Sequence, residues 1–224
     1  MGKVKILYED SSYIGFFKPA GVPTTYGAEK GCFVEQVKAQ FPELFTFTGF
    51  KKEEGGLLYR LDNDACGLLL FAKNEEAFHR FNNDETLEKI YIVEIAPSES
   101  EKFKELPQTG LLTFPIVHKS SKKMAALLPD KKIHYHGKPL SAETHYEKLN
   151  KRLVRCKIKK GVRHQIRVHM ATADAPIVGD TLYGGKPAET LHLCCVGMLS
   201  KKTGLTPLKI DARKELKTIV PWVA

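Results

Sequence analysis

Apolar and polar positions along the chain predict many short strands and few helices. Alternation or short β-type runs predict strands over residues 3–8, 13–17, 89–96, 110–116, 142–149, 152–159, 190–199 and 208–212. Asn150 and Lys151 separate two of these runs and predict a long hairpin there. The mixture predicts an α+β fold.

Helical spacing of apolar residues appears in a few segments. Residues 31–41 have this spacing and stop at Pro42, and a helix after Asn74 has a favourable capping residue. Residues 163–173 predict a third helix, and a short one is expected near 100–106.

The chain is organised around residues 56–73, where a polar group from Arg60 to Asp64 lies between two apolar segments. Such a group predicts a loop at a sheet edge, a place where binding and catalytic side chains concentrate. The alternative is that Asp62 and Asp64 only turn the backbone, as aspartates commonly do.

Arg60-Leu61-Asp62, followed by Gly67 and the apolar run up to Lys73, resembles the catalytic motif of the RluA-type pseudouridine synthases. Further segments resemble the family's other motifs in the same order, and the resemblance covers roughly residues 6 to 212. These segments are residues 6–22, 89–93, 161–170 and 176–184.

The resemblance implies a mixed, mostly antiparallel central sheet with flanking helices, which is the pseudouridine synthase catalytic fold. It also implies isomerisation of specific uridines in structured ribosomal or transfer RNA, with no metal and no cofactor. At 224 residues the chain can form one large domain or two closely packed subdomains. We expect a single catalytic domain over residues 1–224, without an appended RNA-binding domain.

By the same resemblance Asp62 is the nucleophile and Arg167 its ion-pair partner, since a nearby cation keeps a carboxylate ionised. We expect the two side chains within ion-pairing reach. Tyr91 matches the tyrosine that lies against the target base, and we expect it to open onto the same cleft. The alternative for Tyr91 is a strand residue packed in the core.

The net charge of +9 favours an anionic partner. Residues 151–167 contain eight Lys or Arg and no acid, a pattern that indicates a phosphate track or simply a solvated face. The residues that we expect to contact RNA are Arg60, Lys157, Lys159, Lys160, Arg163 and His164.

The sequence departs from the family pattern at three places. Tyr59 replaces a histidine, Ala65-Cys66 replaces Thr-Ser, and Val162-Arg163 replaces Arg-Thr. These departures leave open an inactive RNA-binding paralogue with the same fold.

The sequence gives little support for a metal or a nucleotide cofactor. The histidine pairs 134/136 and 164/169 lack a third ligand of suitable spacing, so we expect no metal. A metal on Asp62 and Asp64 is a weaker alternative. The sequence contains no phosphate-binding glycine loop, so nothing in it indicates a nucleotide cofactor.

Five cysteines without a Cys-x-x-Cys pair suit reduced thiols. With no signal peptide and no membrane span, we expect a cytoplasmic monomer.

Overall fold

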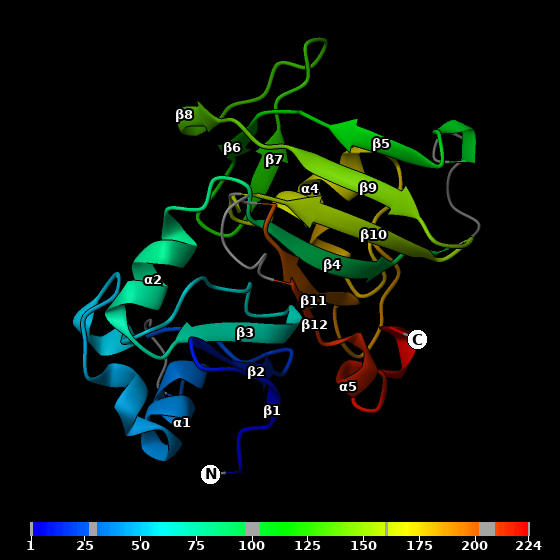
Figure 1. Ribbon diagram of the computed structural model, residues 1–224. Helices are drawn as coiled ribbons and strands as arrows, with labels where there is room; N and C mark the ends of the chain where they lie inside the picture. Colours follow the sequence, from blue (N-terminus) through cyan, green and yellow to red (C-terminus); the bar gives the residue numbers. More distant parts are fainter. Residues whose placement is uncertain (1, 27–30, 97–103, 160, 202–208, 224) are drawn as a thin grey trace. The chain divides into compact units, whose positions relative to one another are not determined.

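The computed structural model describes residues 2–26, 31–96, 104–159, 161–201 and 209–223. The chain divides into two compact units, one made of Met1–Leu87 with Cys194–Ala224 and the other of Glu88–Leu193 (Figure 1). The expectation of one catalytic domain over residues 1–224 stays a prediction.

The first unit contains a sheet with β3 in its interior. The strands predicted over residues 3–8 and 13–17 are confirmed as β1 (Ile6–Glu9) and β2 (Tyr13–Lys18), which pair antiparallel. β3 (Cys66–Ala72) pairs antiparallel with β2 and parallel with β11 (Leu193–Leu199), and β12 (Lys209–Asp211) pairs antiparallel with β11. Every residue of β3 is buried, as a strand covered on both faces requires.

Helices of the first unit follow the predicted signals. α1 (Phe33–Gln40) ends before Pro42, and α2 (Glu75–Asn82) begins after Asn74, whose side chain accepts the Ala77 N–H at 2.8 Å. This N-cap was predicted and is confirmed. α5 (Arg213–Lys217) was not predicted. Short 3₁₀ segments cover Pro42–Phe45, Lys52–Glu54 and Pro221–Val223.

The second unit contains an antiparallel sheet in the order β4-β10-β9-β5. Its strands are β4 (Glu88–Glu94), β10 (Leu153–Ile158), β9 (Thr144–Lys148) and β5 (Thr109–Leu112). The predicted hairpin around Asn150 and Lys151 is confirmed, since β9 and β10 pair in register there. α4 (Gln165–Thr172) lies within the predicted helix.

A three-stranded sheet in the second unit was not predicted. β6 (Ile116–His118) lies between β7 (Met124–Ala126) and β8 (His136–Leu140). The strand predicted over 110–116 is confirmed only for residues 110–112, within β5, because β5 ends at Leu112 and a separate strand, β6, starts after Pro115. Proline has no N–H for a sheet ladder and interrupts the strand. Of the helix predicted near 100–106, residues 100–103 lie outside the described residues.

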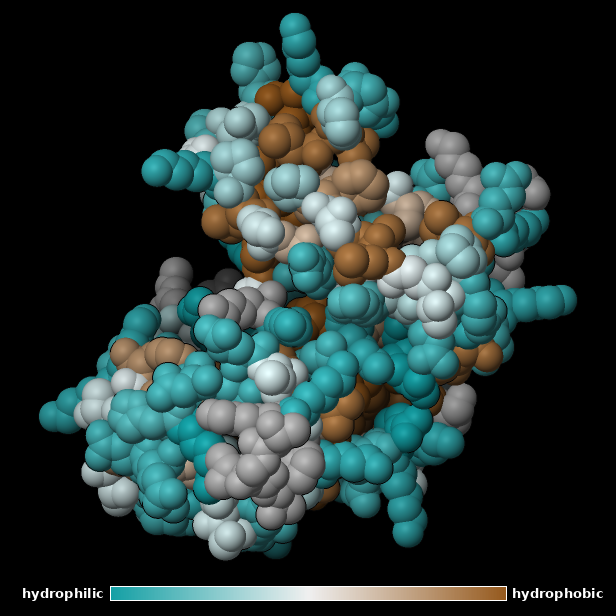
Figure 2. Space-filling model, turned by 45° about the horizontal axis from the view of Figure 1, so that its top comes forward, coloured by the Kyte–Doolittle hydropathy of each residue, from teal (hydrophilic) through white to brown (hydrophobic). Residues whose placement is uncertain are grey.

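The two units together confirm an α+β fold whose described strand pairs are mostly antiparallel. In the space-filling view of Figure 2, hydrophilic residues cover much of the visible surface, and hydrophobic residues are exposed there in patches. Among the described residues, no helix has the length and apolar character needed to cross a membrane.

Candidate active site

Residues 59–65, which we call the Asp62 loop, lie between two paired β segments of the first unit. Before it, Leu58 donates its N–H to the Leu70 carbonyl of β3 at 3.1 Å, and after it β3 begins. Within it, the Ala65 N–H donates to the Asp62 carbonyl at 3.2 Å. Asp62 is half-buried in this loop.

The segment after β2 holds the backbone on both sides of Asp62. The buried Thr24 hydroxyl donates to the Leu61 carbonyl at 2.7 Å and accepts the Leu61 N–H at 3.1 Å. The Gly21 N–H donates to the Asn63 carbonyl at 2.9 Å. The position of Asp62 therefore depends on a tertiary contact and not on its own turn alone.

Lys18 provides a second link between the same segments. Its side chain is fully buried, and its Nζ donates to the carbonyls of Pro19 at 2.8 Å, Val22 at 2.7 Å and Asn63 at 3.1 Å. An ammonium has three N–H donors, and here each has an acceptor.

Burial lowers the pKa of Lys18 to about 8, and the negative charges of Cys66, Asp64 and Asp62 act in the opposite direction. Since this pKa lies above 7, Lys18 is mostly protonated at neutral pH. A positive charge thus lies near the Asp62 loop, within the first unit, and favours ionised carboxylates there.

Arg167 belongs to α4 in the second unit and is held by Asp180. Its Nε donates to one carboxylate oxygen of Asp180 at 2.8 Å and its terminal nitrogen to the other at 2.7 Å. Both side chains are buried, with 4% and 0% of their surface exposed. This two-point contact fixes the direction of the guanidinium plane.

Tyr183 lies beside this ion pair. Its ring centre is 5.2 Å from the Arg167 guanidinium and 5.4 Å from the Lys123 ammonium. The hydroxyl accepts the Met124 N–H at 3.0 Å and lies 2.8 Å from Nδ1 of His164. Tyr183 therefore connects α4 with the small sheet of β6, β7 and β8.

His164 precedes α4 in a left-handed backbone conformation, with φ of 56°. Burial lowers its pKa to about 4, and the charges of Arg167 and Arg163 act in the same direction. At neutral pH this imidazole is uncharged and contributes no positive charge for phosphate. Its contact with RNA stays a prediction, as does that of Arg163, which is exposed and donates to the Ser121 carbonyl at 2.9 Å.

Tyr91 lies on the face of the second unit's sheet that α4 covers. It pairs in register with Cys156, whose sulfur is 4.0 Å from the sulfur of Met170 in α4. Only 5% of Tyr91 is exposed. Whether its ring meets the target base stays a prediction.

The basic run does not lie on one surface. Alternation along β10 places Lys157 on the face opposite Cys156 and α4, and the exposed Lys159 follows one residue beyond the strand. Arg163 and His164 lie at the other side, at the start of α4. Lys160 lies outside the described residues.

The predicted catalytic residues are divided between the units. Asp62 belongs to the first, and Tyr91 and Arg167 to the second. Arg60, which we expect to contact RNA, is exposed and also belongs to the first unit. The pairing of Asp62 with Arg167 joins the units and stays a prediction. Across the part of the chain that is described, no three His, Cys, Asp or Glu side chains form a group that could hold a metal.

Comparison with known proteins decides the family. Residues 12–172 match the model of the RNA pseudouridylate synthase family. The chain belongs to this family. Ribosomal large subunit pseudouridine synthase D of Yersinia pestis is 32% identical over 190 residues, which cover 81% of this chain and 53% of the relative. The chain thus spans about half the length of that relative.

Two further family members are similar over more of their own length. An uncharacterized RNA pseudouridine synthase of Zymomonas mobilis is 31% identical over 198 residues, covering 84% of this chain and 81% of the relative. Human RNA pseudouridylate synthase domain containing 1 superposes with a TM-score of 0.68 over 93% of this chain and 82% of that one. At 17% identity this likeness shows the fold alone.

Two departures from the family pattern have structural explanations. Tyr59 donates its hydroxyl to the Leu68 carbonyl at 2.6 Å, and its ring stacks on Phe81 with centroids 6.4 Å apart. Cys66 pairs in register with Cys194 of β11, and a hydrogen bond with that thiol lowers the pKa of Cys66. Both residues tie the ends of the Asp62 loop to the core of the first unit.

Sequence reasoning missed the supporting residues of the site. Asp180, Tyr183, Lys18 and Thr24 were not singled out, although the first three lie in segments that resemble the family. Asp180 is the only acid in residues 176–184, directly after the basic motif, and this was the available signal for a partner of Arg167.

Proposed function

We propose that this chain is an RNA pseudouridine synthase that isomerises specific uridines in structured RNA without a metal or cofactor. One observation carries the proposal: in a member of this family, the half-buried Asp62 of the Arg-Leu-Asp motif lies on a loop held by Thr24 and Lys18. A carboxylate that is accessible but has a fixed backbone suits a nucleophile.

In the proposed reaction the Asp62 carboxylate attacks C1′ of the uridine as the bond between C1′ and N1 breaks and the base leaves as an anion. The base rotates, C5 attacks C1′ and displaces the carboxylate, the hydrogen on C5 is released as a proton, and N1 takes up a proton. Arg167 pairs with Asp62 and keeps it ionised. Tyr91 replaces the stacking that the uridine loses when it leaves its neighbours. Arg60 contacts RNA or orders the loop.

Ribosomal RNA is the substrate that the comparisons favour, since the Yersinia pestis relative is named for the ribosomal large subunit. Transfer RNA is the alternative. We place the enzyme in the cytoplasm as a monomer, where reducing conditions suit its five buried cysteines, which form no disulfide.

The decisive experiment compares Asp62→Asn with Asp64→Asn, which makes the same chemical change at an exposed position in the same loop. Tritium release from 5-labelled uridine in bulk RNA should vanish for Asp62→Asn and persist for Asp64→Asn. Filter binding should show that both retain RNA affinity. Release at the wild-type rate by Asp62→Asn would show that Asp62 is not the nucleophile.

The inactive RNA-binding paralogue gives a different result. In that case the wild-type protein binds RNA with a steep salt dependence but releases no tritium from any RNA pool.

A further inference from the structure

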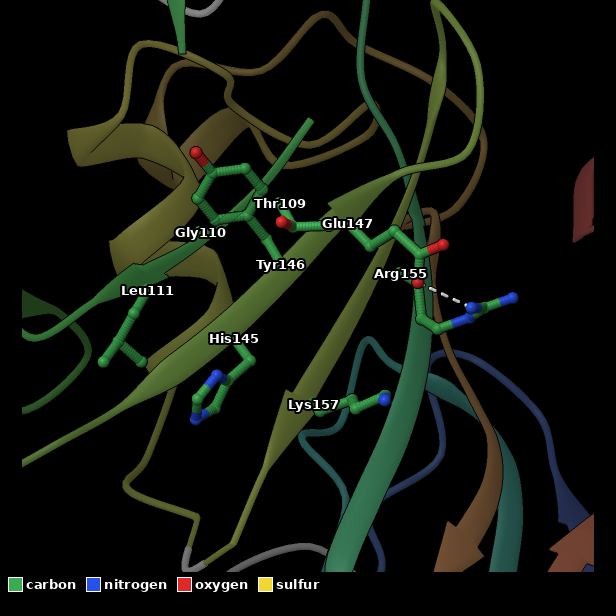
Figure 3. A pocket seen from close by; sticks show the side chains of 8 residues that line it. All are labelled: Thr109, Gly110, Leu111, His145, Tyr146, Glu147, Arg155 and Lys157. Atoms are coloured by element: carbon green, nitrogen blue, oxygen red, sulfur yellow. Dashed lines mark hydrogen bonds and ion pairs between the residues drawn. The ribbon is translucent and has the colours of Figure 1, made fainter. Parts of the chain in front are cut away.

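On one face of the sheet in the second unit, mostly polar side chains line a hollow (Figure 3). Strand register places Leu111, His145 and Lys157 in one row across β5, β9 and β10. The neighbouring row holds Thr109, Glu147 and Arg155. We call these two rows the hairpin face.

The opposite face of the same strands is covered by α4. Cys156 contacts Met170 there, and the buried Thr144 hydroxyl lies 3.1 Å from the Gln165 amide and 2.9 Å from the His169 imidazole. The hairpin face is instead exposed or half-buried, and its hollow has a volume of about 340 Å³. This volume lies at the lower end of the ~300–1,000 Å³ typical of small-molecule sites.

The side chains of the hairpin face differ from one end of the hollow to the other. At one end the Lys157 ammonium lies in the same row as His145 and Leu111, the latter with 47% of its surface exposed. At the other end Arg155 donates to Glu147 at 2.6 Å. One end therefore offers a cation beside a flat ring and an apolar side chain, and the other offers an ion pair.

We propose that the hairpin face binds one unpaired nucleotide of the RNA substrate, with its phosphate on Lys157 and its base against His145 and Leu111. Phosphates bind to Lys and Arg, and unstacked bases pack on aromatic and apolar side chains. The Arg155 guanidinium is already paired with the Glu147 carboxylate, so this end attracts a second phosphate less than Lys157 does, and the site takes a single nucleotide and not a duplex backbone. This inference rests on the proposed function, because it makes RNA the ligand.

Tyr91 lies on the other face of the sheet, the one covered by α4. The hairpin face therefore differs from the surface predicted to hold the target base. It would contact RNA outside the reacting uridine and contribute to the choice of substrate.

A short fluorescein-labelled oligocytidylate tests the site, since it contains no uridine and cannot be isomerised. Its affinity is measured by fluorescence anisotropy over a salt series, with the full chain. The double variant Leu111→Ala/His145→Ala should bind about tenfold more weakly through lost base packing. Lys157→Ala should also reduce the slope of log affinity against log salt by about 0.7.

Lys138→Ala is the matched control, because this exposed lysine belongs to β8 in the other sheet of the same unit. It should change neither affinity nor slope by as much as Lys157→Ala. Thermal midpoints confirm that each variant is folded. Glu147→Gln should bind more tightly, because Arg155 loses its carboxylate partner and its charge becomes available to phosphate.

Wild-type affinity in the double variant would overturn the inference. So would a dimer in sedimentation that Leu111→Glu dissociates, since the hairpin face would then be an interface between two copies. The proposed function is judged separately: loss of tritium release in Asp62→Asn bears on catalysis, whereas oligocytidylate binding bears on this site.

Discussion

Arg167 and Asp180 form a buried, two-point ion pair, with nitrogen–oxygen distances of 2.8 and 2.7 Å. Tyr183 lies against the same guanidinium. A buried arginine held in this way has one orientation, so the residue that we propose to pair with Asp62 does not need to be ordered by substrate. In the proposed pairing of Arg167 with Asp62, Asp180 would therefore act as a positioning residue.

Replacing Asp180 by Asn should destabilise the protein, because the buried Arg167 charge loses its partner. The free energy of unfolding should fall by about 3–5 kcal/mol, measured by urea denaturation. Asp174→Asn is the control, since Asp174 is exposed and Asn tolerates its left-handed backbone. Adding Arg167→Gln to Asp180→Asn should restore part of the loss, and equal stability of the Asp180→Asn protein and wild type would contradict the role.

Lys18→Met should loosen the Asp62 loop, because three backbone carbonyls lose their common donor. We expect a loss of about 2–4 kcal/mol in stability and faster hydrogen exchange at the Gly21 N–H, which bonds to Asn63. Lys5→Met, at an exposed position, serves as the control. Unchanged exchange at Gly21 would show that Thr24 alone holds the loop.

His164 should make stability depend on acid pH. Its folded pKa of about 4 lies below the ordinary 6.5, so the unfolded chain takes up the proton first as pH falls. Stability from this group is complete above pH 6.5 and is lost progressively down to about pH 4. Urea midpoints of wild type should fall more steeply over this window than those of His164→Asn, which suits the left-handed backbone.

Burial also lowers the pKa values of His169 and His192, so these residues reduce stability as the pH falls. Because wild type and His164→Asn both contain them, their contributions cancel in the comparison. Parallel curves for the two proteins would show that His164 is not held neutral.

Tyr91→Phe separates stacking from proton movement. The ring remains, so RNA affinity should stay within about twofold of wild type, while tritium release should slow by about a hundredfold if the hydroxyl moves a proton. Tyr146→Phe makes the same change at a buried tyrosine of β9 and should leave the rate unaltered. A wild-type rate in Tyr91→Phe would restrict Tyr91 to a stacking role.

Chelation should leave activity intact, because the proposed chemistry obtains its charge from Asp62 and Arg167. Tritium release measured before and after dialysis against EDTA should agree. Loss of release that added Mg²⁺ restores would favour the alternative in which Asp62 and Asp64 hold a metal.

Local and periodic features of the fold were predictable from the sequence. The β9–β10 hairpin follows from alternation on both sides of Asn150, and the start of α2 follows from the Asn74 cap. Both depend on neighbours in the chain, which a sequence pattern records. The Arg-Leu-Asp motif likewise indicated the loop that carries Asp62.

Tertiary structure decided which side chains support that site and which surfaces are open. Alternation placed Cys156 and Lys157 on opposite faces of β10, but only the packing of α4 determined that the Cys156 face is covered. The same holds for the burial of Lys18 and for the pairing of Arg167 with Asp180. Such contacts join segments that are separate in the chain, and their geometry depends on how whole elements pack, which no local pattern contains.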